Sequence, residues 1–232
     1  MTTSMKNNAW LGALGALFLM AGSNVAQAQA RITEVAPWSS GTSVGADWFE
    51  LTNTGSSALS ISGWKMDDNS FAFGSAVALT GITTLAAGES VIFLEGGAAE
   101  VANFVNAWFG GNKPASLQIG TYSGSGVGLS TSADGVAVFN AAGVLQAKVS
   151  FGASDATAPL QSFDNSLGLD NVTLSALSTL GTNGAFASTD GSMIGSPGAV
   201  SAVPEPASYA LLLGGLSAVG FIARRRGASR KA

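Results

Sequence analysis

The chain ends in an apolar run that is closed by three arginines, and this ending constrains where everything before it can fold. The run covers residues 207–223, and Arg224, Arg225 and Arg226 follow it. As a helix it would be about 25 Å long, slightly less than the roughly 30 Å hydrocarbon core of a bilayer. Moving each arginine through that core costs roughly 3 kcal/mol, so the arginines stay on the cytoplasmic side. The sequence therefore predicts a transmembrane helix at 207–223, a basic cytoplasmic tail at 224–232, and a body that folds outside the membrane.

The N-terminus has the three parts of a secretory signal peptide. Lys6 supplies a positive start, an apolar run follows at 10–20, and Ala28 and Ala30 flank Gln29 in an A-x-A pattern. The apolar run is too short to span a membrane, and the small residues suit cleavage. We predict a signal peptide at 1–30 and a mature chain that begins at Arg31; a retained N-terminal anchor is the alternative.

Directly before the apolar run stands a Pro-Glu-Pro motif, formed by Pro204, Glu205 and Pro206. The motif, the short hydrophobic helix and the arginines together resemble the PEP-CTERM sorting signal of Gram-negative bacteria that make exopolysaccharide. The resemblance implies an exosortase, a membrane enzyme, as a processing partner. It also implies export across the inner membrane, an anchored form that faces the periplasm, and a final place at the cell surface or in the extracellular matrix. An ordinary C-terminal anchor after a proline-rich stem is the alternative.

Composition excludes several classes of function. The sequence has no cysteine and no histidine, which removes disulfides, the usual zinc sites, thiol nucleophiles and the Ser-His-Asp triad. Residues 31–203 carry 4 basic and 13 acidic side chains, a net charge of −9. A nucleic acid is not an expected partner, because binding phosphates needs a basic surface. We expect no cofactor and no bound metal.

The body shows the alternation of half-buried β-strands. Apolar Leu145, Ala147, Val149 and Phe151 alternate with polar residues, and turn residues recur every eight to twelve positions, as in an all-β sandwich or barrel. One helix is predicted at 98–109, ended by two glycines, with its apolar face over an edge or an end of the sandwich. Residues 159–195 are expected to be mostly long loops, with one late strand near 172–174.

Five short segments of the body resemble the lamin-tail domain. The resemblance implies an immunoglobulin-like β-sandwich over 31–198, followed by a linker at 199–206. It also implies a secreted or surface protein, and it brings no catalytic residues. The segments are Ile32-Thr33-Glu34-Val35, Asp47-Trp48-Phe49-Glu50-Leu51-Thr52-Asn53-Thr54-Gly55, Leu59-Ser60-Ile61-Ser62-Gly63-Trp64, Leu85-Ala86-Ala87-Gly88-Glu89-Ser90 and Gly195-Ser196-Pro197-Gly198.

Tryptophans are the first candidates for ligand contact, because aromatic rings stack on the apolar faces of sugars. Trp38 lies in a loop between predicted strands and is the best of them, although packing is the more frequent role for such a residue. Trp48 and Trp64 lie inside the fold-defining segments, so we expect them to pack as framework.

Carboxylates are the second group of candidates. Glu34 and Glu50 lie on neighbouring predicted strands and would be a paired acid and base in a hydrolase, but their place in the fold motif favours a structural role. Acidic turns supply oxygen atoms of the kind that calcium prefers, without the spacing of an EF-hand loop. Ordinary turn geometry explains them better. These turns contain Asp67, Asp68, Asn69, Asp164, Asn165, Asp170 and Asn171.

Three functions fit these observations. The leading hypothesis is an exported, non-enzymatic protein that serves adhesion or organisation of the extracellular matrix. The alternative is a carbohydrate-binding module for the exopolysaccharide of the host. A hydrolase that uses Glu34 and Glu50 is the weakest of the three.

Overall fold

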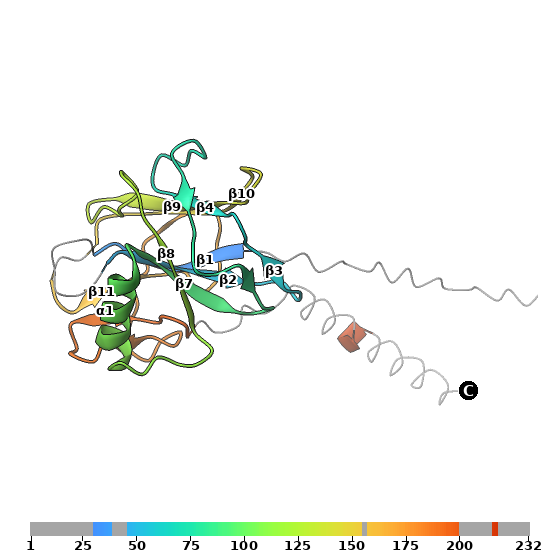
Figure 1. Ribbon diagram of the computed structural model, residues 1–232. Helices are drawn as coiled ribbons and strands as arrows, with labels where there is room; N and C mark the ends of the chain where they lie inside the picture. The colour runs from blue at the N-terminus through green and yellow to red at the C-terminus, as the bar shows by residue number, and fades with distance from the viewer. Residues whose placement is uncertain (1–29, 39–45, 155–156, 200–214, 218–232) are drawn as a thin grey trace, which may run out of the picture.

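The body is an all-β sandwich of two five-stranded sheets. The computed structural model describes residues 30–38, 46–154, 157–199 and 215–217. In Figure 1 the sheet that contains β4, β9 and β10 lies above the sheet that contains β1, β2 and β7. In spatial order the first sheet is β12 (Phe163–Asp164), β1 (Ala30–Ala36), β2 (Trp48–Asn53), β7 (Ser90–Glu95) and β8 (Gln118–Tyr122), and the second is β13 (Val172–Leu174), β10 (Leu145–Phe151), β9 (Asp134–Phe139), β4 (Lys65–Asp67) and β5 (Val77–Ala78).

Two smaller sheets complete the strands. One pairs β3 (Leu59–Ser60) with β6 (Thr84–Leu85), and the other has the order β11 (Leu160–Gln161), β15 (Met193–Gly195) and β14 (Phe186–Ala187). The expectation of one strand within 159–195 is therefore wrong, although most of the segment lies outside strands as predicted. The late strand at Val172–Leu174 is present, but four two- or three-residue strands accompany it. Strands this short show too few residues for a periodic signal.

The core between the two large sheets explains the alternation in the sequence. Ala147, Val149 and Phe151 face inward and are buried, as the pattern predicts, whereas Leu145 at the strand start is exposed. The strand has a register shift between Leu145 and Ala147. The inner faces of both sheets contribute a single apolar cluster, which includes Ile32, Val35, Phe49, Leu51, Met66, Val91, Phe93, Val136 and Val138.

The helix α1 (Ala98–Phe109) has the predicted bounds and ends at Gly110, whose φ of 57° is the left-handed conformation that glycine adopts without strain. It connects β7 to β8, which run parallel to each other. Parallel neighbours need a crossover segment that passes over a face of the sheet. Accordingly, the buried Phe104 and Trp108 pack on the outer face of the first sheet, and not over an edge or an end.

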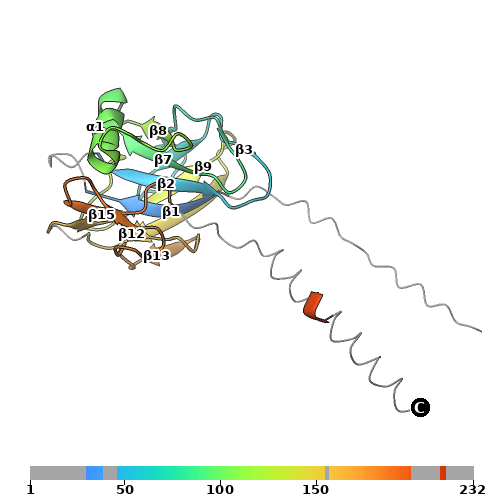
Figure 2. The same ribbon diagram turned by 90° about the horizontal axis from the view of Figure 1, so that it is seen from below.

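A third layer covers that outer face. Figures 1 and 2 show α1 and the short C-terminal strands on the side of the first sheet that lies opposite the second sheet. A second apolar cluster joins this layer to the first sheet. The layer contributes Met193 from β15, and the sheet contributes Trp48 from β2. The outer face of a sheet that would otherwise meet water is thereby buried, which is why the six residues of β2 are all buried.

The sorting signals lie largely outside the described residues. Ala28, the Pro-Glu-Pro motif and the three arginines are not described, and neither is the predicted transmembrane segment apart from residues 215–217. Within the described ranges, no helix has the length and apolar character needed to cross a membrane. Ala30 is described: it begins β1 and pairs with Asn53.

Candidate functional site

Glu34 and Glu50 face each other across β1 and β2, as neighbouring strands predict. A register shift in β1 between Ile32 and Glu34 makes Thr33 an extra residue. Such a bulge changes the alternation of side chains, so that Val35 keeps its place in the inner core while Glu34 meets the partners of the outer layer. Both glutamates are fully buried.

Neutral hydrogen-bond donors surround the two carboxyl groups. Glu34 Oε1 accepts from Ser162 Oγ and, at 2.8 Å, from Ser196 N, while Glu34 Oε2 accepts from Ser196 Oγ at 2.9 Å. Glu50 Oε1 accepts from Thr33 Oγ1 at 2.7 Å. These partners satisfy buried oxygens that would otherwise cost several kcal/mol.

The end of the domain is held by the same pair. Glu50 Oε2 accepts a hydrogen bond of 2.6 Å from Gly198 N, two residues beyond Ser196. The Gly195-Ser196-Pro197-Gly198 segment, which carries part of the resemblance to lamin-tail domains, therefore binds the first two strands through their carboxyl groups. Gly195 is required at its position, because a Cβ there would lie 2.7 Å from Glu34 Oε1.

Burial favours the neutral form of both acids. It raises the pKa of Glu34 from 4.5 to about 7, against the lowering effect of its hydrogen bonds from Ser162 and Ser196. Burial and the neighbouring charge of Glu34 raise the pKa of Glu50 to about 8. The pair therefore holds a proton at neutral pH, with Glu50 the more strongly protonated partner. Because both groups are inaccessible to solvent, the arrangement supports the structural role over hydrolysis.

Trp38, the best tryptophan candidate for ligand contact, is buried in the aromatic cluster of the outer layer. It is 4% exposed, its ring stacks on Trp108 at 6.3 Å, and it meets Trp48 edge-on at 6.3 Å. The broad face that a sugar would need is thus covered by another ring, so the structure does not support this expectation. Trp48 and Trp64 are 1% and 5% exposed, which confirms their role as framework.

The carboxylates of the acidic turns accept hydrogen bonds from nearby residues of the same chain. Asp67 accepts hydrogen bonds from Ser70 Oγ, Ala72 N and Ser75 Oγ, and Asp170 accepts one from Lys148 N. Nowhere in the described ranges do three carboxylates gather as a cation site would require. The turn interpretation accounts for these contacts.

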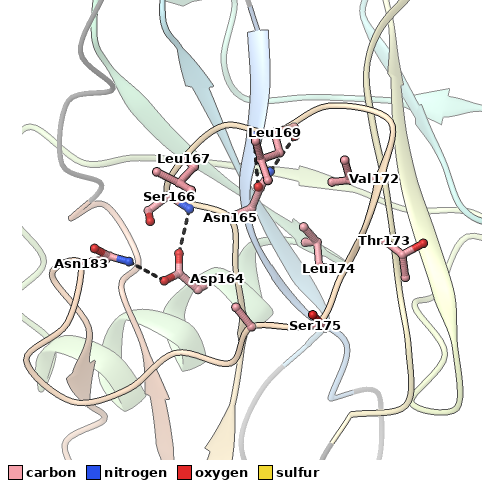
Figure 3. A pocket seen from close by; sticks show the side chains of 11 residues that line it. Asp164, Asn165, Ser166, Leu167, Leu169, Val172, Thr173, Leu174, Ser175 and Asn183 are labelled. Atoms are coloured by element: carbon pink, nitrogen blue, oxygen red, sulfur yellow. Dashed lines mark hydrogen bonds between the residues drawn. The ribbon is translucent and has the colours of Figure 1, made fainter.

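The structure also contains a pocket that the sequence did not indicate. It has a volume of about 440 Å³ and opens beside the loop that joins β12 to β13 (Figure 3). A missed signal was the pair of leucines, Leu167 and Leu169, in a turn rich in Asp, Asn, Ser and Gly. The lining residues are Asp164, Asn165, Ser166, Leu167, Leu169, Val172, Thr173, Leu174, Ser175, Ala176 and Asn183.

These features define an all-β sandwich that is closed by a buried carboxyl pair, with a preformed pocket on one side. Comparison with family models matches residues 23–153 to the Lamin Tail Domain, more than half of the chain, and the protein belongs to that family. A second model, the PEP-CTERM protein-sorting motif, matches residues 202–226. Both resemblances noted in the sequence are confirmed, the first of them over residues 23–153. No curated protein matches the chain.

Proposed function

We propose that the protein is a non-enzymatic component of the cell surface or extracellular matrix, delivered through its sorting motif and used for adhesion or matrix organisation. The observation that carries the proposal is the combination of a lamin-tail body with a PEP-CTERM motif in one chain. The motif implies export and processing by an exosortase, and neither family is catalytic. The burial of the Glu34 and Glu50 pair agrees with this view.

The membrane topology of the chain and its proteolytic processing test the proposal directly. Protease added to intact spheroplasts should digest the body and spare the arginine tail. Intact mass of the protein recovered from outside the cell should show both ends removed, the first near Arg31 and the second near the Pro-Glu-Pro motif. A matched variant, with Pro204, Glu205 and Pro206 replaced by alanine, should accumulate in the membrane unprocessed. A body that is protected from protease while the tail is cut contradicts the proposal.

Binding of the host's exopolysaccharide is the second candidate function. The carboxylate of Asp164 and the amide of Asn183, adjacent in the pocket, are groups that can accept or donate hydrogen bonds to sugar hydroxyls. The tryptophans give no aromatic platform, because all three candidates are buried. Titration with purified polysaccharide would test this candidate, with binding monitored through the amide NMR signals of the pocket residues.

A further inference from the structure

Two leucines that are exposed to solvent form the rim of the pocket. Leu167 is 74% exposed and Leu169 is 49% exposed. The loop that carries them is fixed by Asn165: its Nδ2 donates to Ile32 O at 2.5 Å and to Leu169 O at 2.8 Å, and its Oδ1 accepts from Leu169 N at 3.1 Å. Because Asn165 joins both ends of the loop, the backbone cannot carry these leucines away from the rim without breaking hydrogen bonds. A preformed apolar rim of this kind favours a partner, since little ordering remains to oppose binding.

One carboxylate at the end of the pocket has a fixed orientation. Asp164 Oδ1 accepts from Ser166 N at 2.7 Å, and Asp164 Oδ2 accepts from Asn183 Nδ2 at 2.7 Å (Figure 3). Each oxygen keeps a second lone pair for a ligand. Both donors are neutral, so the charge of the carboxylate is oriented by them but not neutralised.

No basic residue lines this pocket in the part of the chain that the structure describes. The four basic residues of that part make contacts elsewhere. Lys65 lies over the ring of Phe73 and Lys148 over the ring of Phe71, while Lys113 donates to Leu117 O and Arg31 donates to Ala30 O. The whole body, residues 31–203, carries a net charge of −9. An anionic ligand would be repelled. A cation would be attracted both by the carboxylate of Asp164 and by the negative potential around the body.

We propose that the pocket binds the side chain of an arginine or lysine presented by a partner protein. The aliphatic stem packs on Leu167 and Leu169, and the cationic head meets Asp164. Long basic side chains combine an apolar stem with a charged end, which matches a pocket that has leucines along its wall and one carboxylate at its end. A sugar would find no aromatic ring among the lining residues. This proposal rests on the proposed adhesive function, for which it names the chemistry of the partner.

The test uses the full chain in nanodiscs, with acetyl-arginine methylamide as the probe and the citrulline analogue as its neutral isostere. We expect arginine to bind with a dissociation constant on the order of 1 mM and citrulline at least about tenfold more weakly, as a single charge-assisted contact implies. Leu167→Ser should weaken arginine binding about three- to tenfold. Leu180→Ser is the matched control, since Leu180 is also exposed, at 56%, but does not line the pocket. It should leave the affinity unchanged.

Asp164→Asn supplies the charge test and should reduce arginine binding to the level of citrulline. Equal affinity for arginine and citrulline, or an affinity that neither Asp164→Asn nor Leu167→Ser changes, overturns the proposal. Binding of a neutral oligosaccharide instead of arginine, lost in Leu167→Ser, overturns it in favour of a glycan site. Absence of all binding also overturns it, but leaves export and processing, which are measured in cells, as they stand.

Discussion

Replacing Glu50 with glutamine should make the protein more stable at alkaline pH. Glutamine has nearly the same shape and remains neutral, and its carbonyl can still accept the hydrogen bond from Gly198 N. The pKa of Glu50 rises from 4.5 to about 8 in the fold, first because of burial and then because of the charge of Glu34. At about 1.4 kcal/mol per pKa unit, ionising this group in the folded protein costs at most about 5 kcal/mol.

The direction of the pH dependence follows from the raised pKa. Below about pH 4.5 the acid is protonated in both the folded and the unfolded chain, so its contribution to stability is fully present. Between pH 4.5 and about 8 the unfolded chain loses the proton while the folded chain keeps it, and stability falls with rising pH. The slope from Glu50 is up to about 1.4 kcal/mol per pH unit. Glu34 adds a similar decline between pH 4.5 and about 7.

The assay is urea unfolding of the full chain in a mild detergent, at pH values from 5 to 9, followed by the emission of the buried tryptophans. Glu50→Gln should match the wild type near pH 5 and exceed it by a few kcal/mol near pH 8.5. Glu34→Gln is the matched control. Like Glu50, Glu34 accepts from a backbone N–H at one oxygen and from a hydroxyl at the other, and a hydroxyl can turn to accept from an amide. This variant should therefore remove only the decline between pH 4.5 and about 7 and leave the decline that Glu50 causes. Parallel curves for the wild type and Glu50→Gln would refute the reasoning.

Three further substitutions test the packing and hydrogen bonding of the body. Asn53→Ala should cost about 3 kcal/mol, because its buried amide donates to the carbonyls of Ser57, Leu85 and Ala86, which would lose their partner. Trp108→Ala should cost about 3 to 5 kcal/mol by opening a cavity in the aromatic cluster. Gly195→Ala should cost about 1 to 3 kcal/mol, since its Cβ would displace the carboxyl group of Glu34. Urea unfolding at pH 6 measures all three, and wild-type stability in any of them would contradict the packing described.

The sequence predicted those parts of the fold that have a periodic signal. The helix at 98–109 repeats apolar residues at helical spacing over three turns, and β10 alternates over seven residues, so both were found. The strands β11, β12, β14 and β15 have two or three residues each and were missed. Their pairing depends on partners far along the chain, such as β12 with β1. No local sequence pattern indicates such a partner.

At the candidate site, too, the sequence predicted some features and not others. That Glu34 and Glu50 would be neighbours followed from their strands, but their protonation depends on Ser162, Ser196 and Gly198, which lie more than 100 residues away along the chain. Trp38 was the best tryptophan candidate for ligand contact because it lies in a predicted loop, although packing was the more frequent role. The sheet face beneath that loop is covered by α1, and the sequence does not indicate which face a crossover helix will take.

If residues 207–223 span the membrane as predicted, the carboxyl pair also limits how far the body lies from the bilayer. Gly198 is held by Glu50, and the predicted transmembrane segment begins at residue 207, so eight residues, or nine Cα-to-Cα steps, connect the last fixed point of the body to the bilayer. A fully extended chain of that length spans about 30 Å. With such an anchor, the body would stay within that distance of the membrane before processing. If the pair opened, residues 196–198 would be free to add to the tether, whereas β15 would stay paired with β11 and β14. Cross-linking from the membrane surface to the body should consequently lose yield as pH rises above 8, and Glu50→Gln should prevent that loss.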